Sequence, residues 1–118
     1  MEKVERPWGS YEVLLDTPKY KVKRITVNPG GQLSEQYHHK RDETWTVVEG
    51  EAQVQLTIDG IVNDWKILPG QTIYIHRLQS HRVKNEKDVP LVFIETQTGD
   101  YFGEDDIVRT KDNYGRVP

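Results

Sequence analysis

The sequence contains no cysteine, and this absence excludes several kinds of chemistry together. A disulfide, a zinc site built on thiolates and a thiol nucleophile all require that residue. Long apolar runs are missing too, since no stretch approaches the roughly 20 apolar residues needed to span a bilayer. Residues 1–6 also lack the apolar centre of a signal peptide. We therefore expect a cytoplasmic protein with no membrane partner.

The chain is also poor in apolar residues and has no excess of positive charge. Hydrophobic residues make up 35% of the 118, and 16 basic residues face 19 acidic ones for a net charge of -3. Without a Lys/Arg-rich run, a nucleic-acid partner is not expected. The length fits one domain, and the low apolar content predicts a thin core, as in a small barrel or an oligomer. We expect a homodimer.

What the sequence does contain is a series of short strand patterns separated by Gly, Pro and Asp-Gly turns. The expected strands are residues 20–27, 43–48, 52–58, 61–68, 71–75, 81–83 and 90–95. Asp59-Gly60 is a strong hairpin signal, and no amphipathic helix or repeat is found. This pattern predicts an all-β sandwich or barrel. Residues 1–118 then form a single domain, with an N-terminal arm (1–19), a barrel core (20–97) and an irregular acidic tail (98–118).

The arm contains one large anchor. Trp8 lies between Pro7 and Gly9, which indicates a turn rather than a regular element. We expect Trp8 to pin the arm to the barrel wall or to a neighbouring subunit.

The stretch from Gln36 to Trp45 concentrates the polar chemistry of the chain. Strand alternation places Glu43 on the same face as Trp45 and Val47, which points inward. An inward carboxylate is costly unless it is paired or bound to a cation. Because His81 follows a second turn, the two segments together suggest a metal site formed where two hairpins meet.

These two segments resemble the two signature motifs of the cupin superfamily. In the first motif, a pair of metal ligands precedes Glu43, and Gly50 follows it at the expected spacing. In the second motif, the matching residues are Gly70, His81 and Asn85, whereas His76 and Leu78 stand where the motif has Pro and Gly.

Two pairs fit the first motif, Tyr37 with His39 and Gln36 with His38. Each pair shares one strand face, so alternation does not decide between them. A phenol is a poor ligand for a divalent ion beside imidazoles, whereas an amide oxygen is an acceptable hard donor. Ligand chemistry therefore favours Gln36 and His38.

Most of the chain is similar to the C-terminal cupin domain of type II phosphomannose isomerases, often fused to a mannose-1-phosphate guanylyltransferase. The similar segments are residues 6–11, 20–25, 36–45, 73–75, 81–82, 103–109 and 114–116. The resemblance implies a double-stranded β-helix and a metal set of Gln36, His38, Glu43 and His81. It implies one divalent ion, with zinc favoured and Mn, Co or Ni as alternatives. The sequence departs from the family at Tyr37, Lys40 and Thr44, where the family has Met, His and His.

The implied reaction interconverts mannose 6-phosphate and fructose 6-phosphate through a cis-enediol, in a sugar-phosphate-binding protein. It needs a Lewis acid, a base and a cationic group for the phosphate. The expected catalytic residues are His39, Lys40, Arg109 and Arg116. Lys40 is expected to contact phosphate or an enediolate oxygen, and the two arginines of the tail are expected to contact the phosphate. The base is not identified, because a regular strand would turn His39 away from the ligand face. Arg41 and Arg82 are expected in surface or interface pairs.

Two other classes remain open. One is a sugar-binding or regulatory cupin without catalysis, and the other is a different cupin enzyme, such as a sugar epimerase or an iron oxygenase. A guanylyltransferase is disfavoured because no Gly-rich nucleotide loop follows a strand. Turnover by the metal-loaded protein separates the first class from the isomerase.

Overall fold

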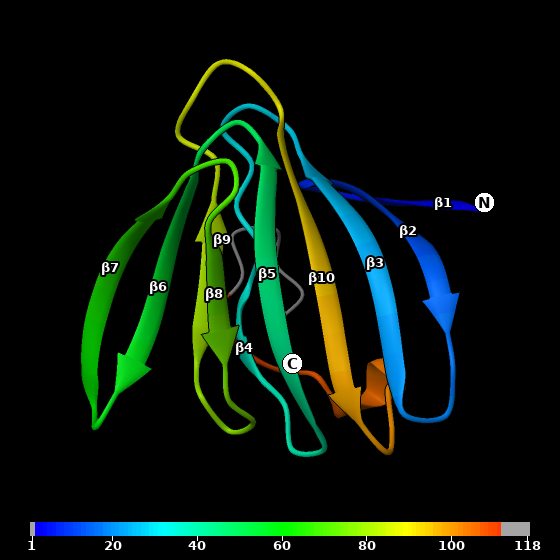
Figure 1. Cartoon of the computed structure of the whole chain (residues 1–118). Coiled ribbons are helices and arrows are strands. Elements are labelled where there is room, and N and C mark those ends of the chain that lie inside the picture. Colours follow the sequence, from blue (N-terminus) through cyan, green and yellow to red (C-terminus); the bar gives the residue numbers. More distant parts are fainter. Residues whose placement is uncertain (1, 112–118) are drawn as a thin grey trace.

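The computed structural model describes residues 2–111, which form two antiparallel sheets that face each other (Figure 1). The six-stranded sheet has the order β1 (Lys3–Arg6), β2 (Gly9–Asp16), β3 (Tyr20–Val27), β10 (Leu91–Gly99), β5 (Arg41–Glu49), β8 (Thr72–Ile75). The five-stranded sheet has the order β11 (Val108–Lys111), β4 (Glu35–Tyr37), β9 (His81–Lys84), β6 (Ala52–Ile58), β7 (Ile61–Ile67). One short 3-10 turn, η1 (Glu104–Asp106), is the helical element of these residues. The all-β prediction is confirmed.

Local sequence signals explain the central hairpins. In β5 every second side chain from Arg41 to Val47 is buried, as the alternation predicts. Asp59 and Gly60 join β6 to β7 with φ values of 51° and 77°. Both are positive, as a two-residue type I′ turn requires.

The N-terminal residues are more regular than predicted. Residues 3–6 and 9–16 form β1 and β2 on the outer side of β3, and the predicted turn lies between them at Pro7 and Trp8. Trp8 is the buried anchor at the β1–β2 connection, and its carbonyl accepts a hydrogen bond from the Asn28 amide at 2.9 Å. The next residue, Gly9, has to be glycine, because a Cβ there would lie 2.0 Å from the Thr26 carbonyl oxygen.

The acidic tail also contains regular structure where an irregular segment was predicted. After η1 the chain forms β11, which pairs with β4. Figure 1 shows this segment, drawn in orange, passing the end of the barrel at which the β4–β5 and β8–β9 connections lie. Of the tail, residues 112–118 lie outside the described range.

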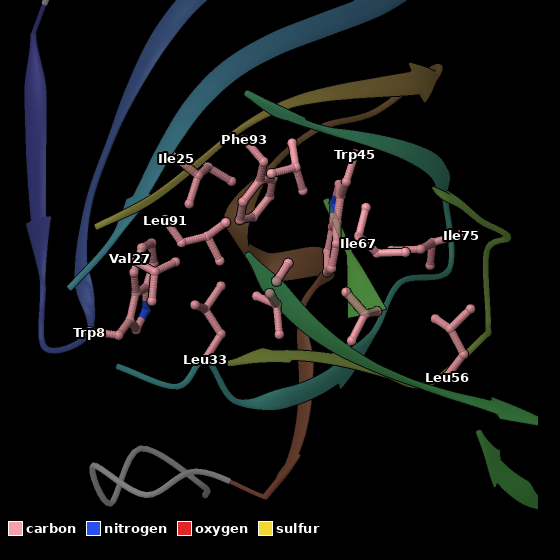
Figure 2. Close-up of a cluster of buried hydrophobic side chains, with 14 residues drawn as sticks. Trp8, Ile25, Val27, Leu33, Trp45, Leu56, Ile67, Ile75, Leu91 and Phe93 are labelled. Atoms are coloured by element: carbon pink, nitrogen blue, oxygen red, sulfur yellow. The ribbon is translucent and has the colours of Figure 1, made fainter. Parts of the chain in front are cut away.

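The core lies between the sheets (Figure 2), and its composition changes along the strands. Inward side chains of β3, β10 and β5 align in cross-strand rows. Two rows are apolar, Val27–Leu91 and Ile25–Phe93–Val47. The next two are largely polar, Lys23–Glu95–Trp45 and Gln97–Glu43. One end of the barrel is therefore an apolar core, and the other presents polar groups to its interior.

No helix among residues 2–111 has the length and apolar character needed to cross a membrane.

Candidate metal centre

Two rows of side chains meet across the polar end of the barrel. From the six-stranded sheet, β5 contributes Glu43. From the five-stranded sheet, the register aligns Arg109, Gln36, His81 and Leu56 on β11, β4, β9 and β6. A cavity between the sheets is lined by Glu43, Gln36, His81 and Arg109, among others. Residues far apart in the sequence are thus brought together by strand register.

His38, Glu43 and His81 form a compact buried group. Their ligand atoms all lie within 4.8 Å of one another. His38 Nε2 is 3.3 Å from Glu43 Oε2, and His81 Nε2 is 3.8 Å from Glu43 Oε1. The carboxylate therefore lies between two imidazole nitrogens that come from separate segments.

Backbone carbonyls orient both imidazoles. His38 Nδ1 lies 3.1 Å from the Asp106 carbonyl oxygen, and His81 Nδ1 lies 2.9 Å from that of Gln79. Because a carbonyl can only accept, each Nδ1 carries the proton and each Nε2 directs a lone pair toward Glu43. This tautomer is the one that a metal-binding imidazole needs at Nε2.

Burial keeps these imidazoles neutral. It lowers the pKa of His38 to about 3, with further lowering by the charge of Arg41. Burial likewise lowers the pKa of His81 to about 4. Two neutral imidazoles beside a carboxylate can hold a divalent ion without losing a proton at neutral pH.

Arg41 and Trp45 hold the Glu43 carboxylate in place. Arg41 Nε donates to Glu43 Oε2 at 2.9 Å, and Trp45 Nε1 donates to Glu43 Oε1 at 3.0 Å. The expectation that Arg41 forms a surface pair is wrong, because this side chain is only 4% exposed. Arg41 Nη2 also lies 3.3 Å from His38 Nε2, so a bound ion would compete with this guanidinium for the same lone pair.

Gln36 is the fourth donor predicted from the sequence. It lies opposite His81 in the β4–β9 register and lines the cavity. Its Nε2 donates to Ser34 Oγ at 3.1 Å. The chemistry of two imidazoles, a carboxylate and an amide fits a divalent cation. The burial of His38 and the exposure of His39 favour the Gln36–His38 pair over Tyr37–His39.

A second buried carboxylate, Glu95, was missed in the sequence. It is 6% exposed and accepts hydrogen bonds from Trp45 Nε1 at 3.1 Å and Gln97 Nε2 at 2.7 Å. Burial raises its pKa, and the charge of Glu43 raises it further. The signal was available, because Glu95 continues the inward alternation of Leu91 and Phe93.

The four predicted catalytic residues are placed differently from one another. His39 and Lys40 are exposed in the β4–β5 connection and do not line the cavity, and the Lys40 ammonium lies over the Tyr101 ring. Arg109 is half-buried and lines the cavity beside Gln36. Arg116 lies outside the described residues. Of these four, placement favours Arg109.

The acidic turn η1 positions this end of the barrel through Asp106. Its buried carboxylate accepts hydrogen bonds from the His39 amide at 3.1 Å and the Lys40 amide at 3.0 Å. Its carbonyl orients His38, as described above. The tail thus fixes the β4–β5 connection and one imidazole together.

The residues that depart from the second cupin motif preserve its turn. Leu78 has a φ of 67°, the left-handed conformation that favours the glycine of the motif. Its amide donates to the His38 carbonyl at 2.7 Å. Asn85, which matches the motif, is fully buried and donates to the carbonyls of Val27 and Val89. Asn85 therefore stabilises the fold at the apolar end of the barrel.

The chain is similar over most of its length to known proteins. The family model described as mannose-6-phosphate isomerase C-terminal matches residues 1–112. The xanthan biosynthesis protein XanB of Xanthomonas campestris is 46% identical over 115 residues, which cover 98% of this chain and 24% of that protein. A mannose-1-phosphate guanylyltransferase of Escherichia coli K12 is 49% identical over 115 residues, covering 97% of this chain and 23% of that protein. The chain thus spans about a quarter of the length of these relatives.

A solved structure supports the fold alone. Bacillus subtilis oxalate decarboxylase superposes with a TM-score of 0.81 at 23% identity, over 93% of this chain and 30% of that one. The cupin architecture expected from the motifs is confirmed by this likeness and by the two facing antiparallel sheets.

Proposed function

This chain belongs to the mannose-6-phosphate isomerase C-terminal family, and on that premise we propose that it is a metal-dependent sugar-phosphate isomerase. The proposed reaction interconverts mannose 6-phosphate and fructose 6-phosphate through a cis-enediol. One observation carries the proposal: two neutral imidazoles and the Glu43 carboxylate form one buried group, beside a cavity that is also lined by a second carboxyl of raised pKa.

In this proposal Gln36, His38, Glu43 and His81 hold one divalent ion. Such an ion supplies polarisation of the carbonyl and hydroxyl oxygens of the substrate. Zinc suits imidazole and carboxylate donors, and Mn, Co or Ni are alternatives. The oxalate decarboxylase of similar fold is described as having Mn(II) centres.

Glu95 is the group best suited to move the proton between C1 and C2. Burial raises its pKa above the ordinary value of a carboxyl, which favours a role in taking up and returning a proton. Trp45 and Gln97 each donate to one of its oxygens and fix its position in the cavity lining. We therefore place proton transfer on Glu95 in preference to the exposed His39 and Lys40.

Two of the three departures from the family pattern lie away from the proposed ligands. Lys40 is exposed in the β4–β5 connection. Thr44 lies on the face of β5 opposite to Glu43 and Trp45. These two departures therefore leave the proposed ligands in place, which weakens the case for a sugar-binding cupin that has lost catalysis.

A coupled assay tests the proposal. Metal-loaded protein should convert mannose 6-phosphate to fructose 6-phosphate, and a chelator should abolish turnover. Glu95→Gln should lower kcat by about 10²–10⁴-fold, the range for loss of a general base, while metal content stays at that of the wild type. Glu86→Gln, on the exposed β9–β10 connection, is the matched control. Metal-loaded wild type without turnover would instead favour a binding module.

A further inference from the structure

A second cluster of charged groups, from β1, β2, β3 and η1, lines the same cavity. We propose that the corner formed by Arg6, Tyr11 and Lys23 binds the phosphate of a phosphomonoester, and that the Glu104 carboxylate occupies this anion site until the ligand displaces it. This inference rests on the proposed function for its choice of a phosphorylated sugar as ligand. The three residues of the corner and Glu104 all line the cavity.

Lys23 is the centre of the phosphate corner. Its side chain is 6% exposed, although it carries an ammonium group, and it shares an inward row with Glu95. A buried ammonium needs compensation by opposite charge or by hydrogen-bond acceptors. Its Nζ lies 3.3 Å from Glu104 Oε1 and 4.3 Å from the centre of the Tyr11 ring. A buried lysine in a cavity is thus compensated by a carboxylate from the tail.

Arg6 and Tyr11 extend the same corner. Arg6 Nη2 lies 3.4 Å from Tyr11 Oη, and the guanidinium carbon lies 5.3 Å from the ring centre. Tyr11 Oη donates to Glu104 Oε1 at 3.2 Å. A phenol and an ammonium thus donate to one acceptor oxygen, and a guanidinium lies beside the phenol. These are groups that a phosphate would meet as donors.

Glu104 is a suitable placeholder because its side chain is 49% exposed, whereas that of Lys23 is buried. One of its oxygens accepts from both Tyr11 and Lys23. The carboxylate can turn toward solvent without moving Asp106, which anchors η1 to the barrel. Displacement therefore exchanges one anion for another at the same donors.

The charge of the cavity also favours an anionic ligand. Five cationic side chains line it, Arg6, Lys23, Arg41, Arg82 and Arg109, against three carboxylates, Glu43, Glu95 and Glu104. This excess of positive charge favours an anionic ligand. Two buried donors, Arg41 Nη1 and Arg109 Nε, have no hydrogen-bond partner among the described residues. The cavity thus has spare cationic donors for a ligand that brings acceptors.

Two substitutions with opposite expected effects test the phosphate corner. Inorganic phosphate and mannose 6-phosphate are titrated separately into metal-loaded protein and followed by calorimetry. Lys23→Met should weaken both ligands by at least about tenfold, because a charge-assisted hydrogen bond is lost. Glu104→Gln should tighten both by several-fold, because the competing anion is gone. Glu12→Gln, which removes an equally charged partner from the Arg24 pair, is the control and should change neither affinity.

The outcomes separate this inference from the proposed isomerase. If Lys23 and Glu104 form only a structural ion pair, both variants lose stability and Glu104→Gln does not tighten phosphate, which overturns the phosphate corner even if turnover is normal. Phosphate affinity that changes in opposite directions in the two variants supports the corner even if no turnover is detected. Tight mannose 6-phosphate binding that is unchanged in Lys23→Met also overturns it.

Discussion

The two imidazoles at the candidate metal centre couple pH to folding. In the folded protein the pKa of His38 is lowered to about 3 and that of His81 to about 4 by burial, whereas both protonate near pH 6.5 in the unfolded chain. At pH values between the folded and the unfolded pKa, the unfolded state therefore binds more protons than the folded state. The free energy of unfolding falls as pH falls through this range. At pH 5 the loss is roughly 2 kcal/mol for each imidazole. The raised pKa of Glu95 acts in the opposite direction and offsets part of the loss.

Urea unfolding of chelator-treated protein between pH 8 and pH 4 measures this effect. We expect the His81→Gln variant to show a shallower decline than the wild type. His39→Gln removes an exposed histidine and serves as the matched control. A free energy of unfolding that is independent of pH from 6.5 to 4.5 would contradict the prediction.

For single residues, the alternating strand pattern predicted some of the inward polar side chains but not others. Glu43 was predicted because its inward position was weighed against the cost of burying a carboxylate, and it is 2% exposed. Glu95 obeys the same rule but was treated only as the end of a strand. Arg41 was misplaced because the local sequence reads as a polar connection, whereas β5 already begins there. Its inward position depends on pairing with Gly99 at the end of β10, which local sequence does not reveal.

Among the elements, η1 connects the tail to the metal centre, and Asp106 is its point of attachment. The Asp106 carboxylate accepts from two backbone amides, those of His39 and Lys40. In an Asp106→Asn variant one amide keeps its acceptor oxygen, but the other faces the NH₂ group of the asparagine, which is also a donor. The β4–β5 connection and His38 should then lose their fixed positions. We expect metal affinity to fall by about 10-fold or more, as for other groups that orient a ligand.

Competition with a chromogenic chelator at neutral pH measures that affinity. Asp105→Asn is the control, because it removes the same charge from an exposed position in the same turn. Equal metal affinity in the Asp106 and Asp105 variants would show that η1 does not position the imidazole. Circular dichroism of both variants checks that the sheets are intact.

The terminal elements were the hardest to predict, for a physical reason. Segments β1, β2 and β11 have weak strand patterns, and each is held by pairing with a strand of the barrel. β11 pairs with β4, more than 70 residues earlier in the chain. The sequence indicates that Gly9 belongs to a turn, but its close approach to Thr26 depends on the β2–β3 register. The central hairpins were predicted because their turns and partners are local.

On the scale of the whole molecule, β7 leaves one edge of the barrel open. Ile61, Val62 and Trp65 on this edge strand are 66%, 54% and 48% exposed. An apolar edge with unpaired backbone groups favours association with another strand. We expect the homodimer predicted from the sequence to form through this edge.

Light scattering after size exclusion tests the dimer. Trp65→Asp should shift the protein toward monomer at micromolar concentration. Leu15→Asp changes an equally exposed apolar residue (53%) on β2 and should leave the mass unchanged. A monomeric wild type, or a dimer unaffected by Trp65→Asp, would contradict this interface.

The position of β10 has a consequence for how the protein is made. This strand is the shared neighbour of β3 and β5, both of which leave the ribosome before it does. Until residues 91–99 have been synthesised, the two halves of the larger sheet cannot join, and such non-local pairing folds on a timescale of milliseconds to seconds. Because β10 contributes Phe93 to the apolar rows and Glu95 to the polar ones, its arrival joins the core, and Glu104 and Arg109 of the following tail then complete the cavity lining. A nascent chain that stalls before β10 would therefore expose both its apolar surface and its unassembled ligands to chaperones and proteases.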